Sequence, residues 1–387
     1  MSDFLDTELN EAEHEILARA GAFRREVVAP GAAAWERGES PLEALRAAAA
    51  MDLLRLEVPE PLGGLGHRYL LKLAIAEDMS QADMGFTFAM INTHNVAARL
   101  AQAPLTAQRK TQIAQLMKAE IFGATALSEP GAGSDFAAIK TRAEKVDGGW
   151  RLSGEKGWIT NATIADLFVT YAQTDPAAGW RGIACFLVDA QRDGFRRGDV
   201  YPLMGGRAIG AGGFTLDGYI APDDDMLSAP GEAFKLAMKS VNGARVYVAA
   251  MCAGMIAGSL ETALAYAAKR QTFGKSLIEH QGIRWSLGNV ATDLEALRAL
   301  TAKAGRLIDA GDDAVMLAAH AKEFAGRVTL SRIGDCMQAM GAAGLRDEHG
   351  LGRHLACAKI AAYTDGSTEI MRERIGAGLV ATYGPSA

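Results

Sequence analysis

Four stretches of this 387-residue sequence combine residue types that could do chemistry. In ALSEPGAGSD (126–135), glycines allow a sharp turn and a close approach of a ligand to the main chain. The segment GEKGWITNA (154–162) offers an indole and a hydroxyl group, and RQTFGKSLIEHQGIR (270–284) offers an arginine whose planar fork suits a diphosphate. The stretch AKIAAYTDGSTEIMR (358–372) places a carboxylate, Asp365, before a glycine. Taken singly, each stretch can also be explained by structure alone, without a functional role. The four structural explanations, in order, are a β-turn, a half-buried strand, a solvent-exposed helix end and an Asp-Gly turn.

The composition narrows the classes of protein to consider. The chain is 49% hydrophobic and 22% charged, which is typical of globular proteins. The net charge of −6 disfavours nucleic acid or an anionic membrane surface as a partner, and we expect neither. No apolar run approaches the roughly 20 residues that cross a bilayer. The acidic start MSDFLDTELNEAEHEI does not resemble a targeting peptide, and the four cysteines form no C-x-x-C pair, so we expect free thiols and a cytoplasmic protein.

The elements that must position these residues follow from the hydrophobic periodicity. A chain of this length exceeds a single core, which rarely grows past roughly 250–300 residues. Helical spacing predicts helices over 10–28, 41–56, 71–79 and 108–119, and short β-like runs between turn residues follow from about residue 123. Long helical patterns return after residue 231. We therefore predict an α+β protein, mainly α, with an N-terminal helical domain (1–122), a middle β-barrel or β-sandwich domain (123–230) and a C-terminal four-helix bundle (231–387).

Together, and in this order, the motifs resemble those of the acyl-CoA dehydrogenases, a family of FAD enzymes, over nearly the whole chain. The four stretches correspond to the family patterns TEPGAGSD, GxKxWITN, RxxFG…HQ and YEGT, and QAMGAAGLRDEHG (338–350) corresponds to QxxGGxG. Two departures stand out besides Asp365. Ala342 replaces the second glycine of GG, and LACAKI replaces MRDAKI, which puts Ala356 and Cys357 where the family has an arginine–aspartate pair. The second departure bears on a family interface or structural contact and not on the cofactor.

The resemblance implies a set of cofactor and substrate contacts. The residues that would lie against the flavin are Leu127, Ser128, Trp158 and Thr160, and Thr160 would hydrogen-bond toward flavin N5. Stacking and hydrogen bonding of this kind can tune the electronic properties of a flavin. Arg270 would bind the FAD pyrophosphate across a dimer interface, beside Phe273 and Gln281. Gln338 and Gly341 would contact the FAD of a neighbouring subunit, and Ser367 and Glu369 its ribose and phosphates. The implied contacts to the CoA substrate are Ser134, which could also reach the flavin phosphates, together with Asn242, Arg245 and Gly366. No metal site is implied.

Asp365 occupies the position of the family's catalytic base, which is usually glutamate. Aspartate is one methylene shorter, roughly 1.5 Å less reach, and a misplacement of about 1 Å can cost on the order of 100-fold in rate. Some family members place the base next to the arginine that corresponds to Arg245, but here that neighbour is Ala244, which cannot abstract a proton. Asp83 and His94 are the remaining ionisable candidates, in the helical segment that the resemblance expects to floor the acyl pocket.

The implied reaction is FAD-dependent α,β-dehydrogenation of an acyl-CoA thioester to the trans-2-enoyl-CoA. The Asp365 carboxylate would remove the α-proton from the substrate, while flavin N5 takes the β-hydride. A backbone N–H at Asp365 and a flavin ribitol hydroxyl would polarise the thioester carbonyl. Electrons would pass to an electron-transferring flavoprotein, and the cross-subunit contacts imply a homo-oligomer, commonly a tetramer made of two dimers.

Several alternatives stay open. The substrate could be an alicyclic or α-branched acyl-CoA, such as cyclohexanecarboxyl-CoA, whose α-proton is presented differently to the shorter base. The physiological direction could instead be enoyl-CoA reduction, or the chain could be a repurposed flavoprotein of the same fold. A flavin monooxygenase is disfavoured because those relatives generally lack a carboxylate base, and a DNA-binding relative is disfavoured by the acidic charge balance.

Overall fold

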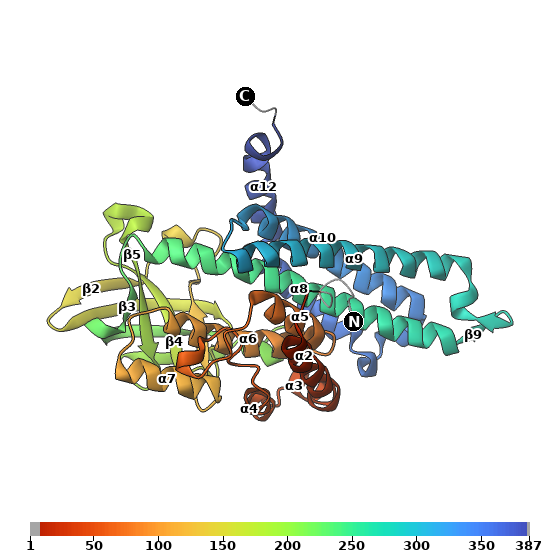
Figure 1. The fold of residues 1–387 in the computed structure, drawn as a ribbon, viewed down its shortest axis with the longest axis horizontal. Helices are drawn as coiled ribbons and strands as arrows, with labels where there is room; N and C mark the ends of the chain where they lie inside the picture. The colour runs from red at the N-terminus through yellow and green to blue at the C-terminus, as the bar shows by residue number, and fades with distance from the viewer. Residues whose placement is uncertain (1–7, 385–387) are drawn as a thin grey trace.

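The computed structural model describes residues 8–384 and has the predicted order of helical, β and helical regions. The β region lies at one end, long helices run from it to the other end, and helix α12 projects away from the body (Figure 1). This confirms the predicted fold class. The exact domain boundaries remain a division made from the sequence, and the first seven residues, part of the segment examined for targeting, lie outside the described residues.

In the N-terminal region, short helices pack around two largely buried helices, α5 (Tyr69–Ser80) and α6 (Met84–Ala101). Helix α2 begins with a capping box, in which Asn10 Oδ1 accepts from the Glu13 N–H and the Glu13 carboxylate accepts from the Asn10 N–H. The helix predicted over 10–28 continues through one π turn to Glu36, whereas the helix predicted over 41–56 stops at Ala50 because the chain turns at Asp52 (φ 70°). The helical elements are α2 (Glu11–Phe23), η1 (Arg24–Val28), α3 (Ala29–Glu36), α4 (Leu42–Ala50), η2 (Glu60–Leu62), α5 (Tyr69–Ser80), α6 (Met84–Ala101) and α7 (Ala107–Met117).

The middle region is one eight-stranded mixed sheet, in the order β6-β7-β3-β2-β4-β5-β8 with β1 parallel to β4. Alternate residues of β4 serve two cores: Leu167, Val169 and Tyr171 pack toward α6 and α7, and Phe168 packs into the opposite core. The sheet therefore lies against the N-terminal helices. Its strands are β1 (Gly123–Ala126), β2 (Arg142–Val146), β3 (Gly149–Ile159), β4 (Leu167–Gln173), β5 (Ile183–Asp189), β6 (Phe195–Val200), β7 (Gly212–Pro222) and β8 (Met226–Ser228).

The C-terminal bundle is built around α8, which packs against α5, α9 and α10. Glycines allow α8 to approach α5 closely: a Cβ on Gly254 would stand 2.1 Å from the Glu77 carbonyl oxygen, and one on Gly258 would stand 2.4 Å from that of Gln81. The elements are α8 (Ala233–Lys269), β9 (Gln271–Thr272), β10 (Lys275–Ser276), α9 (Gln281–Ala310), α10 (Val315–Met340), α11 (Leu351–Tyr363) and α12 (Thr368–Tyr383).

Helix α8 corrects one expectation from the sequence. The helix is long enough and apolar enough to cross a membrane, and an 18-residue window of it has a mean hydropathy of 1.5. The expectation that no apolar run approaches the length of a membrane-spanning helix was therefore wrong. However, 67% of that window is buried inside the fold. Its hydropathy is that of the central helix of the bundle. The cysteines are free and buried, as predicted.

Candidate functional site

Asp365 lies in the short loop between α11 and α12. Two buried cationic side chains contact the backbone carbonyls of this loop. Asp365 has φ 55° and Gly366 has φ 102°, so two consecutive residues take the left-handed region. Arg245 Nε, from α8, donates to the Asp365 carbonyl at 2.9 Å, and Lys322 Nζ, from α10, lies 3.4 Å from the Gly366 carbonyl. Arg245 also donates to Asn242 Oδ1 at 2.6 Å. The predicted substrate residues Asn242, Arg245 and Gly366 therefore surround the predicted base.

The Asp365 carboxylate has the electrostatics of a general base. Its Oδ2 atom is buried and has no hydrogen-bond partner among the described residues. Burial raises the pKa of Asp365 to about 6, against the opposing charges of Lys322 and Arg245. A carboxyl group with this pKa is ionised at neutral pH yet basic enough to accept a proton. Burial also lowers the pKa of Lys322, and it lowers that of Arg245 to about 10.

The other candidate bases have structural partners. Asp83 caps α6 by accepting from the Phe86 N–H at 2.7 Å, and it pairs with Arg353 at 3.2 Å. His94 Nε2 lies 3.1 Å from Glu57 Oε2. Ala244 is buried on α8 and carries no ionisable group. Asp365 is thus the carboxylate that the geometry favours.

The two motifs of the β domain lie side by side, together with the residues predicted to face the flavin. The Gly157 N–H donates to the Ser128 carbonyl at 3.1 Å. Trp158 has φ 60° and leaves 65% of its surface exposed, with its ring 4.8 Å from that of Tyr201. The Thr160 carbonyl accepts from Asn92 on α6 at 3.1 Å. An uncovered indole therefore stands beside the loop that contains Leu127 and Ser128, while Ser134 is exposed further along that loop.

Sequence reasoning missed the ion pair that joins these two motifs. Lys156 Nζ donates to Glu129 Oε1 at 3.0 Å and to the Leu127 carbonyl at 3.1 Å, and both side chains of the ion pair are buried. The Glu129 carboxylate also accepts from the Lys140 N–H and from the N–H and hydroxyl of Thr141. Burial lowers the pKa of Lys156 to about 8, although Glu129 acts in the opposite direction. The sequence signal that could have revealed this ion pair is Lys156, a lysine next to Gly157 within a predicted strand.

A second buried contact fastens these motifs to the N-terminal helices. Asn161 donates through Nδ2 to the carbonyls of Ala89 and Gly123, at 2.8 and 3.1 Å, and to Thr93 Oγ1 at 3.2 Å. Asn161 is fully buried and has φ 63°, which asparagine tolerates better than most residues. These hydrogen bonds fix the position of the C-terminal end of β3 relative to α6.

The predicted phosphate-binding residues gather elsewhere in the chain. Arg270 ends α8, Phe273 forms the tip of the β9–β10 turn with 98% of its surface exposed, and Gln281 begins α9. This tip is at the far end of the bundle from the start of α12, and the antiparallel course of α9 and α10 brings Gln338 and Gly341 toward the same end (Figure 1). Within a single chain, the predicted phosphate-binding residues of this group therefore lie far from Asp365. Ser367 and Glu369 remain beside Asp365, where Ser367 caps α12.

The residues present fit a flavin dinucleotide. Gly131 and Gly133 have open space where a Cβ would stand, so the loop offers main chain to a ligand. Trp158 and Phe273 present uncovered aromatic faces, and Arg270 is exposed beside Phe273. These are the contacts that a planar ring system and a diphosphate require.

Comparison with known proteins identifies the family. Residues 10–120, 124–219 and 231–380 match the N-terminal, middle and C-terminal domains of acyl-CoA dehydrogenase. The chain belongs to the acyl-CoA dehydrogenase family. It is an oxidoreductase that acts on acyl-CoA, and its cofactor is FAD.

Three relatives illustrate the match. The short/branched chain specific acyl-CoA dehydrogenase of Rattus norvegicus is 32% identical over 331 residues, which are 86% of this chain and 77% of that protein. The butyryl-CoA dehydrogenase from Megasphaera elsdenii is 28% identical with a TM-score of 0.92, covering 96% of this chain and 99% of that one. A structure of PigA with FAD and proline is 26% identical with a TM-score of 0.91, covering 96% and 98%.

Replacement of Lys156 tests the ion pair under the flavin-facing loop. In Lys156→Met the Glu129 carboxylate stays buried without its cation, so we expect the free energy of unfolding to fall by about 3–5 kcal/mol, with weaker FAD retention. Denaturant unfolding and the visible flavin absorbance of the purified protein measure the two effects. The matched control is Lys303→Met, at an exposed position of α9. Equal stability and flavin content in the two variants would show that the pair does not support the loop.

Proposed function

We propose that this protein dehydrogenates an acyl-CoA thioester to the trans-2-enoyl-CoA with Asp365 as the base. The observation that supports this assignment is the buried, unpartnered Oδ2 atom of Asp365, in a loop whose carbonyls two cations hold. The base removes the proton from the carbon next to the thioester carbonyl. FAD supplies the acceptor for the two electrons that leave the neighbouring C–H bond. By family resemblance, an electron-transferring flavoprotein then reoxidises the cofactor.

The chain's own residues do three things in this reaction. Arg245 and Lys322 engage the carbonyls of Asp365 and Gly366 rather than the carboxylate itself, which leaves Oδ2 free to take a proton. The positive charges nearby keep the carboxylate ionised in a site that burial would otherwise make neutral. The backbone N–H at Asp365 is the donor proposed for the thioester oxygen.

The shorter base favours a second candidate within the same reaction. A substrate branched or cyclic at the α-carbon presents its proton differently, and a similar protein from Rattus norvegicus is named for short and branched chains. We therefore include 2-methylbutyryl-CoA and cyclohexanecarboxyl-CoA as test substrates beside straight chains.

Anaerobic mixing with acyl-CoA tests the proposal directly. We expect straight or branched acyl-CoA to bleach the flavin, and Asp365→Asn to slow bleaching by at least about 100-fold, because general base catalysis contributes this much or more. FAD content measured by absorbance should stay near the wild-type level. A panel of straight, branched and cyclic acyl-CoAs that leaves the wild-type flavin oxidised would refute the dehydrogenase assignment, and an active Asp365→Asn would refute the base.

The pH dependence follows from the raised pKa of Asp365. The base works when deprotonated, so the rate of flavin reduction should rise with pH through about 6 and level off above it. Lys322→Met removes a positive charge that lowers this pKa, so its acid limb should move to higher pH. Lys322→Arg keeps the charge and is the matched control. Stopped-flow bleaching from pH 5 to 9 measures the limb, and superimposable profiles for wild type and Lys322→Met would contradict the role of Lys322.

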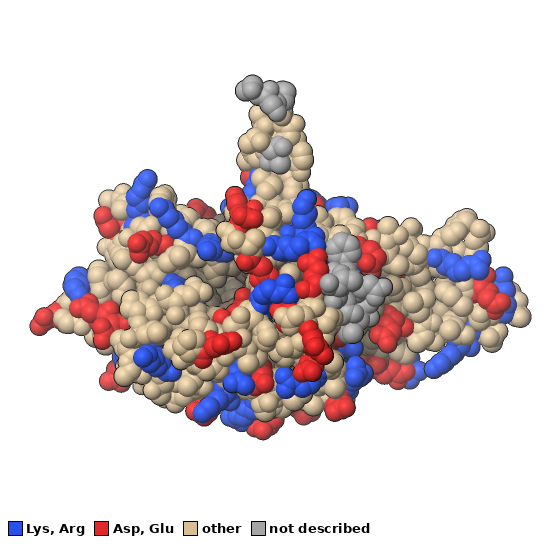
Figure 2. Space-filling model, viewed as in Figure 1, with Lys and Arg blue, Asp and Glu red and all other residues tan. Residues whose placement is uncertain are grey.

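We further propose that the protein works as a homotetramer made of two dimers. Helix α12 projects from the body, and Figure 2 shows little charge on its outer part, because the charged residues of this helix lie in its first two turns. Its residues Leu379, Val380 and Tyr383 are 50%, 85% and 68% exposed, and Phe273 and Trp285 are exposed at the other end of the bundle. Apolar surface of this extent favours burial against another copy, and a second copy would bring the Arg270 group to the Asp365 group.

The oligomer has its own test. Val380→Asp places a charge in the apolar surface of α12, and we expect the mass in solution to fall below that of the wild-type tetramer in sedimentation experiments. Glu373→Gln, at an exposed polar position on the same helix, is the control and should keep the wild-type mass. A monomeric wild-type protein that retains FAD would contradict the assembly.

A further inference from the structure

Buried polar side chains lead from Asp365 into the N-terminal helices. Tyr247 lies on α8 two residues beyond Arg245, and burial together with the charge of Asp365 raises its pKa. One turn earlier on α8, the Gly243 carbonyl accepts from the hydroxyl of Tyr69 on α5 at 2.5 Å. The Tyr247 hydroxyl accepts from Asn95 Nδ2 on α6 at 3.4 Å, and the ring makes an edge contact with Phe88, with centroids 6.2 Å apart. These residues form the wall beside the base on the side of α6.

An ion pair closes the far end of this wall. The Lys72 ammonium binds the Glu57 carboxylate, and it lies 4.5 Å from the ring centroid of Tyr69 and 5.7 Å from that of Tyr247. It is also 3.4 Å from Asn95 Oδ1. Lys72 is 5% exposed and its neighbour His94, which lies beside Glu57, is 1% exposed. Two aromatic faces, an amide and a carboxylate therefore fix the ammonium in place.

The Glu57 carboxylate is ionised at working pH. Burial alone would raise the pKa of Glu57, but Lys72 and His94 lower it to about 2. A hydrocarbon chain that grows from the thioester toward α5 would have to separate the pair or lie against charged atoms. The gain from burying each further methylene is smaller than the cost of breaking a buried ion pair. The pair is thus a barrier to longer chains.

We infer that Lys72 and Glu57 form an ionic floor to the acyl pocket that restricts the substrate to short acyl groups of the butyryl type. The inference rests on the proposed function, because it concerns the acyl group held against Asp365. It also accounts for a lysine on α5, a helix in which every residue is buried, and for its partner Glu57 in the loop between α4 and η2.

The chain-length profile of the wild-type protein tests the floor without any variant. We expect kcat/KM for butyryl-CoA to exceed that for octanoyl-CoA by about 100-fold or more, the order that a filled apolar pocket can discriminate. Octanoyl-CoA or palmitoyl-CoA turned over as well as butyryl-CoA would overturn the inference while leaving the dehydrogenase intact. Absence of flavin reduction with every acyl-CoA would instead refute the proposed function.

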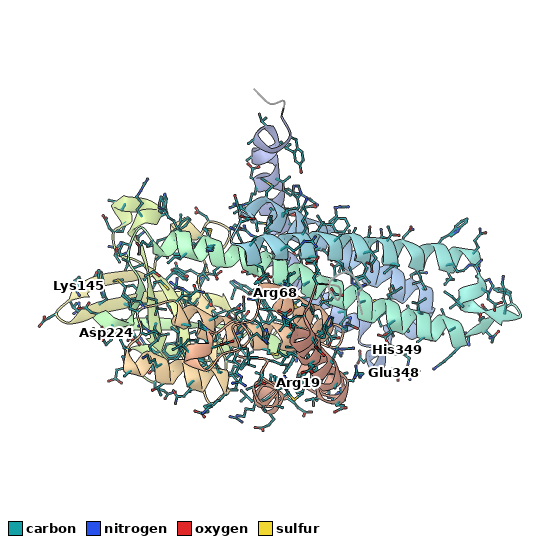
Figure 3. The ribbon with its side chains drawn as sticks, viewed as in Figure 1. Arg19, Arg68, Lys145, Asp224, Glu348 and His349 are labelled. Carbon is teal, nitrogen blue, oxygen red and sulfur yellow. The ribbon has the colours of Figure 1, made fainter. Side chains whose placement is uncertain are left out.

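A paired substitution tests which residues set the limit. The double variant Lys72→Met with Glu57→Gln removes both charges and leaves no unpaired ion. We expect the ratio of kcat/KM for octanoyl-CoA to that for butyryl-CoA to rise by about 10-fold, since the further methylenes of the longer chain no longer meet an ion pair. The control is Lys145→Met with Asp223→Asn, an exposed ion pair at the tip of the β domain, where Figure 3 labels Lys145. Equal ratios in both double variants would overturn the assignment, and the wild-type profile decides it should the first variant not fold.

Discussion

The site depends on two cations that bind backbone carbonyls instead of the carboxylate between them. Arg245 and Lys322 come from different helices, α8 and α10, and they meet the consecutive carbonyls of Asp365 and Gly366. A buried cation is costly unless a hydrogen bond compensates it, and here the loop provides that compensation. The Asp365 carboxylate therefore gains the electrostatic support of two positive charges, while its Oδ2 atom has no hydrogen-bond partner among the described residues. Direct ion pairs would have given a less basic carboxylate.

Helix α6 carries this arrangement to the flavin-facing side. Asn92 holds the Thr160 carbonyl, and Asn95, about one turn later, holds the hydroxyl of Tyr247 near the base. Asn161 fastens the sheet to the same helix through the Ala89 carbonyl. Three amides thus couple the β domain, α6 and α8.

Much of the fold could be predicted because its periodicities are strong, and the failures have local causes. The helix at 10–28 was extended by a π turn that leaves the apolar spacing unbroken, and the helix at 41–56 was cut short by a positive φ at Asp52. Arg245 and Gly366, which the sequence singled out, lie against Asp365 in the structure, and their roles stay predictions. Glu129, Lys156 and Lys322 were missed because a buried charge is recognised by its partner, and the partners lie 27 to 44 residues away in sequence. The separation of Arg270 from Asp365 within one chain is what the cross-subunit contact implied by the resemblance requires, and hydrophobic periodicity alone does not reveal it.

The aspartate at the base position is consistent with the backbone that bears it. A residue at φ 55° pays a steric cost that asparagine and aspartate tolerate better than most other residues with a side chain. The left-handed loop thus suits aspartate better than glutamate. The reach lost by the side chain must then be recovered by the position of the substrate. A short acyl group, stopped by the Lys72–Glu57 pair, can settle deeper against the loop than a long one anchored along its whole chain. The short base and the ionic floor are therefore two parts of one constraint on the size of the acyl group.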